Sequence, residues 1–184
     1  MLPVTIHFKA DLDDYLTHQL FIASKSASIA KKRRRNKLVV SFLFAAAGAT
    51  FFATGNIPLG SALLTIGILW FVFYPVWEAK QFTKQMHNML LENFKTPPNN
   101  QTTITLNKDV ILIHDETNKT SIKTGLVTLI VEIPSLILVR FSDGRSFLVP
   151  KNKTENLEDF ENGLRELARQ LNIKYTEEPE WRWT

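Results

Sequence analysis

The strongest pattern in the sequence is a long uncharged run in its first half. Residues 38–77 contain no Asp, Glu, Lys, Arg or His, and only Gly55, Asn56 and Pro58 interrupt the apolar side chains with residues typical of a turn. The turn separates segments of 17 residues (38–54) and 21 residues (57–77), and roughly 20 residues are needed to cross about 30 Å of hydrocarbon. The pattern therefore predicts two transmembrane helices. A hairpin buried inside a soluble protein is the alternative, but the flanking sequence has too little apolar helix to surround it.

The sequence on either side of this run predicts further helix. Residues 4–8 alternate apolar and polar side chains as a short strand does, and Asp11 then begins a helix with acidic side chains in its first turn. We expect this helix to continue through residue 29 into the first span. After the second span, apolar side chains at helical spacing predict an amphipathic extension over residues 78–95, which the two prolines at 97–98 end.

The second half of the chain changes to the period of strands. Six short strands are predicted, separated by turn residues, at 103–106, 110–114, 121–124, 126–133, 136–141 and 146–149. Asp143 and Gly144 form a strong two-residue hairpin signal. Consecutive hairpins predict an antiparallel β-meander. A final helix over residues 155–171 has an apolar stripe that we expect to close one face of the sheet: Leu157, Phe160, Leu164, Leu167 and Leu171.

The predicted fold class is membrane α+β, with a transmembrane helical hairpin and a small cytoplasmic antiparallel β-meander closed by a C-terminal helix. The expected organisation is a strand and helix in residues 1–37, two spans in 38–77, a helical extension in 78–95, a sheet-and-helix domain in 102–171 and a tail in 172–184. The N-terminal strand and helix are predicted on the same side of the membrane as the domain, where they can pack against it.

The charges predict the orientation of the hairpin. Residues 1–37 carry eight Lys and Arg against three Asp and Glu, whereas residues 78–184 carry 14 against 15. The excess is concentrated in six cations directly before the first span, here called the basic cluster: Lys31, Lys32, Arg33, Arg34, Arg35 and Lys37. Lys80 and Lys84 follow the second span. Cationic flanks stay in the cytoplasm, so both termini are predicted to be cytoplasmic.

The basic cluster has a second interpretation besides topology. Juxtamembrane cations attract anionic lipid headgroups by around 1 kcal/mol each, so membrane lipids are expected partners of these six residues. A nucleic-acid partner is not expected, because the excess charge is one cluster beside an apolar run and the folded remainder is near neutral.

Small residues recur in both predicted spans, at Ala45, Gly48 and Ala49 in the first and at Gly60 and Gly67 in the second. Small side chains allow helix backbones to approach closely in a membrane. The pattern predicts packing of the two spans within the chain, and homo-oligomerisation through the same faces is the alternative.

Residue patterns typical of catalysis are missing from the sequence. The chain has no cysteine, and its four histidines form no pair at the spacing of a helical zinc site. No glycine-rich phosphate loop or Gly-x-Ser-x-Gly turn is present, and neither span carries the ionisable residue that marks a transport path. We therefore expect no cofactor, no metal site and no catalytic residue, and the chain is not predicted to be an enzyme.

Several segments together resemble a known family. The acidic helix start at 11–15 (DLDDY), the basic flank, the hairpin, the β-meander and the run at 146–151 (SFLVPK) before a terminal helix are similar in content and order to the YcxB-like membrane proteins of bacteria. The resemblance implies a pleckstrin-homology-like cytoplasmic domain and a multi-pass location in the bacterial cytoplasmic (inner) membrane. Where that family often has a tryptophan before the strand near Leu126, this chain has KTGL at 123–126.

Three functions are compatible with these patterns. The favoured prediction is a membrane-anchored binding or regulatory module whose cytoplasmic domain docks an unidentified protein partner or a lipid headgroup. The alternatives are a structural subunit of a larger membrane assembly and a membrane enzyme with an unrecognised site.

Overall fold

The computed structural model describes residues 3–94, 101–115 and 118–184. The chain divides into two compact units. The strand-rich unit comprises Met1–His18 and Met89–Arg182, and the helical unit comprises Gln19–Asn88 together with Trp183–Thr184.

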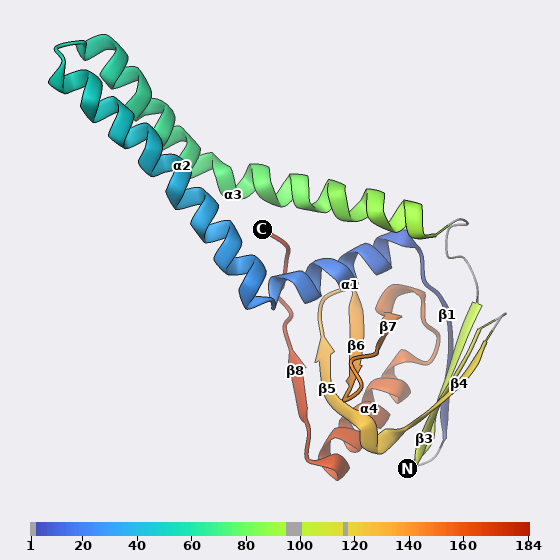
Figure 1. Cartoon of the computed structure of the whole chain (residues 1–184). Helices are drawn as coiled ribbons and strands as arrows, with labels where there is room; N and C mark the ends of the chain where they lie inside the picture. Colours follow the sequence, from blue (N-terminus) through green and yellow to red (C-terminus); the bar gives the residue numbers. More distant parts are fainter. Residues whose placement is uncertain (1–2, 95–100, 116–117) are drawn as a thin grey trace. The chain divides into compact units, whose positions relative to one another are not determined.

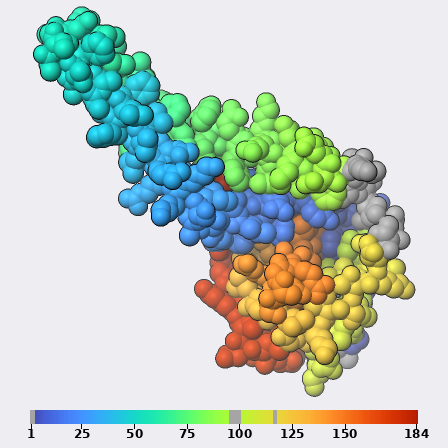
Figure 2. Space-filling view, viewed as in Figure 1, coloured from blue at the N-terminus to red at the C-terminus, as the bar shows by residue number. Residues whose placement is uncertain are grey.

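Two long helices dominate the helical unit. Helix α2 (Ala27–Ala53) and helix α3 (Ile57–Asn93) are joined by a tight turn in which Gly55 has a φ of 82°, a conformation that glycine adopts without steric cost. Both helices are long and apolar enough to cross a membrane. Figure 2 shows the two helices packed against each other around the turn. Of the most apolar 18-residue stretch in each helix, only 6% in α2 and 17% in α3 is buried inside the chain.

Glycines allow the two helices to approach closely. A Cβ at Gly48 would lie 2.9 Å from Leu64 Cγ and 3.1 Å from the Gly60 carbonyl oxygen, and a Cβ at Gly67 would lie 3.0 Å from Phe44 Cβ. Since real Cβ atoms rarely approach other atoms this closely, larger side chains would push the helices apart. These three glycines therefore pack within the chain, as the sequence pattern predicted.

The prediction of one helix from residue 11 into the first span was wrong. Helix α1 (Leu12–Ser24) ends before Lys25, and α2 begins at Ala27 with Ser26 as its N-cap. The Ser24 hydroxyl donates to the Phe21 carbonyl oxygen at 2.7 Å, and Ser26 Oγ accepts from the Ile29 amide at 3.5 Å. Serine side chains compete with helical backbone hydrogen bonds in this way, which explains the break. Helix α3, in contrast, continues through Pro75 to Asn93.

The strand-rich unit contains two four-stranded sheets (Figure 1). The first is antiparallel and joins the N-terminal strand β1 (Val4–Lys9) to β2 (Gln101–Leu106), β3 (Val110–His114) and β4 (Lys119–Lys123), in that order. The second has the order β7 (Ser146–Pro150), β6 (Leu136–Phe141), β5 (Val127–Glu132) and β8 (Lys174–Glu177). Strand β8 pairs with β5 in parallel, whereas the other neighbours are antiparallel.

The prediction of a single antiparallel meander therefore needs correction. Strands β2–β4 and β5–β7 are consecutive hairpins as expected, but they belong to different sheets. A short 3₁₀ turn, Thr124–Leu126, separates them. The Thr124 hydroxyl donates to the Lys108 carbonyl oxygen at 3.0 Å, and the Ser142 amide donates to that of Leu126 at 2.8 Å. These bonds turn the chain out of the first sheet, and residues 174–177, predicted as tail, add the parallel strand.

Helix α4 (Leu157–Leu171) contacts β1 of the first sheet and β8 of the second. Both flanking residues, Asn156 and Asn172, are in the left-handed conformation, which asparagine tolerates better than most residues. Phe160, Leu164 and Leu167 of the predicted stripe are buried, with exposed fractions of 0%, 0% and 1%. Leu157 and Leu171, at the two ends of the helix, are partly exposed.

Candidate functional site

All six residues of the basic cluster lie in the first part of α2. Lys31, Lys32, Arg34 and Arg35 are exposed, whereas Arg33 and Lys37 are half-buried. The six cations look equivalent in the sequence, but in the structure they differ in the residues that they contact.

Arg33 is held by neighbours inside the helical unit. Its Nε forms an ion pair with Glu78 of α3, and its second guanidinium nitrogen donates to the Thr184 backbone oxygen at 2.9 Å. The guanidinium carbon also lies 4.9 Å from the centre of the Trp183 ring, within the range of a cation–π interaction. Both side chains of the ion pair are mostly shielded, with exposed fractions of 23% and 17%.

The Trp183 side chain is fixed on α3 as well. Its Nε1 donates to the Ala79 carbonyl oxygen at 3.1 Å, and its ring lies 5.1 Å from that of Phe82. We call this set the Arg33 clasp: Arg33, Glu78, Ala79, Phe82 and Trp183. The clasp connects α2, α3 and the last two residues, so Arg33 is already engaged by the protein.

The contact made by Lys37 shows which residues of α3 lie beside the basic cluster. Lys37 Nζ lies 3.8 Å from the centre of the Phe71 ring on α3. Together with the Arg33–Glu78 ion pair, this contact places the basic turns of α2 beside residues 71–78 of α3. Trp70 and Trp77, 5.9 Å apart between ring centres, belong to the same stretch of α3. Cations and amphipathic aromatic rings therefore lie at one level, as in the headgroup region of a membrane.

A shallow, almost wholly apolar groove runs along α3 from this level toward the turn at Gly55. It is lined by Ile66, Leu69, Trp70, Phe73, Tyr74 and Trp77. The rings of Trp70 and Tyr74 lie 5.3 Å apart in a tilted arrangement. The groove and the four exposed cations are two surfaces of the helical unit for which no partner is found among the described residues.

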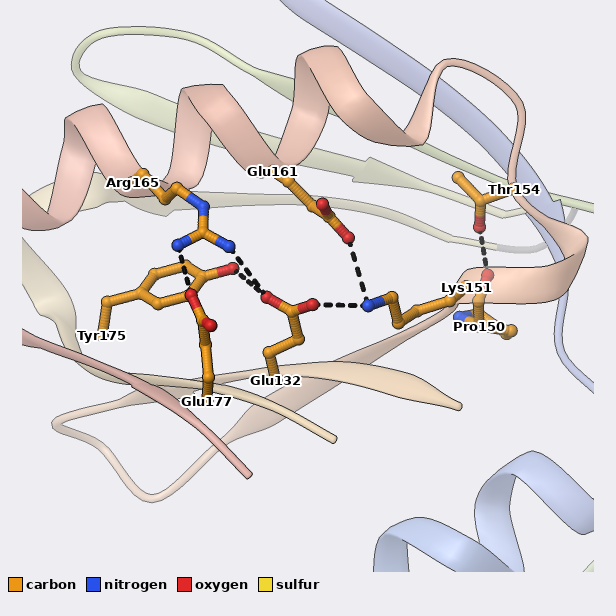
Figure 3. A network of polar contacts seen from close by, with 8 residues as sticks. All are labelled: Glu132, Pro150, Lys151, Thr154, Glu161, Arg165, Tyr175 and Glu177. Carbon is orange, nitrogen blue, oxygen red and sulfur yellow. Dashed lines mark hydrogen bonds and ion pairs between the residues drawn. The ribbon is translucent and has the colours of Figure 1, made fainter. Parts of the chain in front are cut away.

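A polar network occupies the strand-rich unit, and Glu132 is at its centre (Figure 3). The Glu132 carboxylate, 15% exposed, accepts from Lys151 Nζ, from the Tyr175 hydroxyl at 2.8 Å and from Arg165 at 3.2 Å. Arg165 also donates to Glu177, and Lys151 lies 3.4 Å from Glu161. The network connects β5, β8, α4 and the segment after β7, so its evident role is to hold these elements together.

The charges in this network shift one another's ionisation. Burial acts to raise the pKa of Glu132, but hydrogen bonds from Lys151 and Tyr175 and the charge of Arg165 outweigh it and lower the pKa. Burial and the hydrogen bond to the Glu132 carboxylate raise the pKa of the Tyr175 hydroxyl well above its ordinary value. At neutral pH Glu132 is therefore ionised and Tyr175 neutral.

The acidic start of α1 forms a second polar contact in the strand-rich unit. The Asp11 amide donates to the Asp14 carboxylate at 2.9 Å, and the Asp14 amide donates to that of Asp11 at 3.1 Å. Lys153 Nζ donates to both carboxylates, at 2.5 and 2.7 Å. The hydrogen bond from Lys153 lowers the pKa of Asp11. These aspartates thus cap a helix, as predicted, and also attach it to the segment after β7.

One histidine is buried in this unit. His18 of α1 is 9% exposed, and its Nε2 lies 3.1 Å from Ser146 Oγ at the start of β7. Burial lowers the pKa of His18, which keeps the imidazole neutral at physiological pH. Among the residues that the structure describes, no group of three or more His, Asp or Glu side chains is placed to hold a metal ion.

Two of these arrangements could not be predicted from the sequence. Trp183 binds Ala79, which is 104 positions away in the sequence. Glu132 binds Lys151, which is 19 positions away. No local sequence pattern marks such pairs. Searches of family models, of curated proteins and of solved structures find no match to this chain. The resemblance to YcxB-like proteins stays a prediction.

Proposed function

We propose that this chain is a membrane-anchored binding module of the bacterial cytoplasmic membrane. In this proposal α2 and α3 cross the bilayer, and both termini and the strand-rich unit lie in the cytoplasm. The module binds a protein or a lipid headgroup and does not catalyse a reaction.

One observation carries the membrane assignment, the exposed apolar surface of the two helices. Phe42 and Leu43 on α2 are 71% and 61% exposed, and Ile68 on α3 is 65% exposed. Soluble proteins rarely leave contiguous apolar surface of this extent in water. A core hairpin of a soluble protein would be mostly buried, so lipid or another membrane helix is the fitting environment.

The charges support the proposed orientation. The basic cluster precedes the first apolar stretch, Lys80 and Lys84 follow the second, and the turn at Gly55 and Asn56 carries no charge. The positive-inside rule then places both flanks in the cytoplasm. The turn is too small to hold a binding site, and the strand-rich unit is left as the part that meets a partner.

The finer fold assignment is part of the same proposal. Two meanders in sequence followed by one helix agree with the pleckstrin-homology-like arrangement that the family resemblance implies, with the helical hairpin inserted between β1 and β2. Strand β8 is an addition to it. Such a unit presents sheet edges and loops for docking, while the Glu132 carboxylate is bound by internal donors.

Single-cysteine labelling tests the topology, because the chain has no native cysteine. In intact cells, Asn56→Cys should react with an impermeant maleimide, whereas Asn118→Cys should react only after the membrane is permeabilised. Labelling of both or neither in intact cells contradicts the hairpin topology, and the reverse pattern contradicts its orientation. Cross-linking in native membranes then separates a binding module, with a substoichiometric partner, from a structural subunit with a fixed stoichiometry.

A further inference from the structure

The apolar groove of α3 continues directly into two cations. Its lining residues Ile66, Trp70, Phe73 and Trp77 are spaced by four, three and four positions, which places them on one face of the helix. The same spacing continues through Lys80 to Lys84 on α3. By this spacing, one helix face carries the apolar groove and then two positive charges, with Pro75 inside the same stretch of helix.

This face crosses the boundary between headgroups and hydrocarbon. The Lys37–Phe71 contact and the Trp70 and Trp77 rings place that boundary beside residues 70–77 of α3, so the groove extends from it toward the bilayer centre over part of the roughly 16 Å between Trp77 and Ile66. Lys80 follows roughly 4.5 Å after Trp77, and the headgroup region extends about 5–7 Å beyond the hydrocarbon. Lys84 lies one helical turn further, within reach for a long, flexible side chain.

Both lysines are available for a ligand. Lys80 and Lys84 are exposed, and within the described part of the chain neither ammonium group takes part in an ion pair. In contrast, the neighbouring cation Arg33 is committed to Glu78. A compact ammonium group pairs well with a phosphate as a point charge.

We propose that the α3 groove seats an acyl chain of one anionic phospholipid of the cytoplasmic leaflet, whose headgroup phosphate is held by Lys80 and Lys84. The occupant is inferred from charge complementarity: the groove itself is apolar, and only its cytoplasmic end is positive. A zwitterionic lipid fits the groove but gains less from the two cations, because its own positive group offsets the phosphate. This inference rests on the proposed membrane anchoring and assigns a specific lipid site to α3.

Fluorescence quenching by brominated lipids tests the site. The reporter is the full chain carrying Trp181→Phe and Trp183→Phe, so that only Trp70 and Trp77 emit, both from the groove. It is placed in phosphatidylcholine nanodiscs with a small fraction of either brominated phosphatidylglycerol or brominated phosphatidylcholine. At low salt the apparent affinity for phosphatidylglycerol should exceed that for phosphatidylcholine by roughly thirtyfold, which corresponds to about 1 kcal/mol per cation.

Charge-matched variants locate the preference. Lys80→Gln with Lys84→Gln should reduce the preference to nearly one while quenching by both lipids persists. Arg34→Gln with Arg35→Gln removes the same charge from α2 and should keep most of the preference.

The possible failures are distinguishable. Quenching by neither lipid means that α3 lies outside the bilayer, and it overturns the proposed function together with the site. Equal quenching by both lipids in the unmutated reporter leaves the membrane anchoring intact and overturns the site. An equal loss in the two double variants would show only diffuse charge attraction and also overturns it. Quenching that disappears as the protein-to-lipid ratio rises would assign the groove to a second copy of the chain instead.

Discussion

Replacing Glu132 by glutamine should destabilise the strand-rich unit strongly. The carboxylate is 15% exposed and accepts from Lys151, Arg165 and Tyr175. A hydrogen bond to a charged group contributes about 1.5–3 kcal/mol. Lys151 and Arg165 keep other carboxylates as neighbours, and the glutamine amide oxygen can still accept from the Tyr175 hydroxyl. The substitution, however, removes the negative charge and places an NH2 donor beside the Lys151 or Arg165 donors. The expected loss is therefore about 2–3 kcal/mol, below the roughly 3–5 kcal/mol for fully orphaning a buried charge.

Glu177→Gln is the matched control. Glu177 binds the same Arg165, but its side chain is 52% exposed, and exposed ion pairs contribute about 1 kcal/mol or less. Hydrogen exchange of the full chain in nanodiscs, followed by mass spectrometry, measures both variants. Amides of β5 and β8 should exchange roughly 30- to 150-fold faster in Glu132→Gln, as the expected free-energy loss requires.

The same variant has a defined pH dependence. Because the pKa of Glu132 is lowered in the folded protein, its charged form stabilises the fold above the ordinary glutamate pKa near 4.3, and this contribution is lost as the pH falls through the folded value. The difference between Glu132→Gln and the parent should therefore be large at pH 7 and shrink below about pH 4. A difference that is independent of pH, or no larger than that of Glu177→Gln, would refute the reasoning.

Three further predictions concern packing and ionisation. Gly48→Leu should force α2 and α3 apart, because a Cβ there already meets Leu64 at 2.9 Å. In detergent, this variant should unfold at a lower temperature than the control Ala45→Leu, whose position is exposed. Leu164→Asp places a carboxylate at a position that is 0% exposed, which costs several kcal/mol, and unchanged resistance to limited proteolysis would contradict this burial. Burial lowers the pKa of His18, so stability should fall as the pH drops below about 6.5, when the unfolded chain takes up a proton first; His18→Asn should weaken this dependence in urea titrations at pH 5 and 8.

Local signals carried most of what the sequence predicted about the elements. The turn at Gly55 is encoded by residues that are next to one another, and so is the hairpin turn at Gly144, where the φ is 84°. The same holds for the stripe of α4, whose central members Phe160 and Leu164 are buried. Composition over 20 residues is enough to recognise a helix that can cross a membrane. Such features do not depend on how distant segments pair.

Strand pairing was beyond the reach of the sequence. Residues 174–177 follow a helix and precede an acidic stretch, and their exposed and half-buried side chains show no apolar alternation. They form a strand because β5 offers a free edge, with Ile130 opposite Tyr175, and because Arg165 and Glu132 bind side chains at that edge. The division into two sheets has the same origin, since bonds at Thr124 and Leu126 redirect the chain between two otherwise similar hairpins.

The basic cluster shows why charge count and charge availability are different quantities. Insertion of a hairpin responds to the summed charge of a flank before tertiary contacts form, so in the proposed topology all six cations are expected to contribute to orientation. Lipid binding by the folded protein depends on the cations that remain free of internal partners. Arg33 is taken up by Glu78 and Trp183, and Lys37 lies over Phe71, which leaves four exposed cations on α2. The two lysines beyond the α3 groove are fewer, but they are aligned with an apolar surface that can hold an acyl chain. For this reason the specific lipid site is assigned to α3, and the denser cluster on α2 is assigned to orientation and general attraction to an anionic surface.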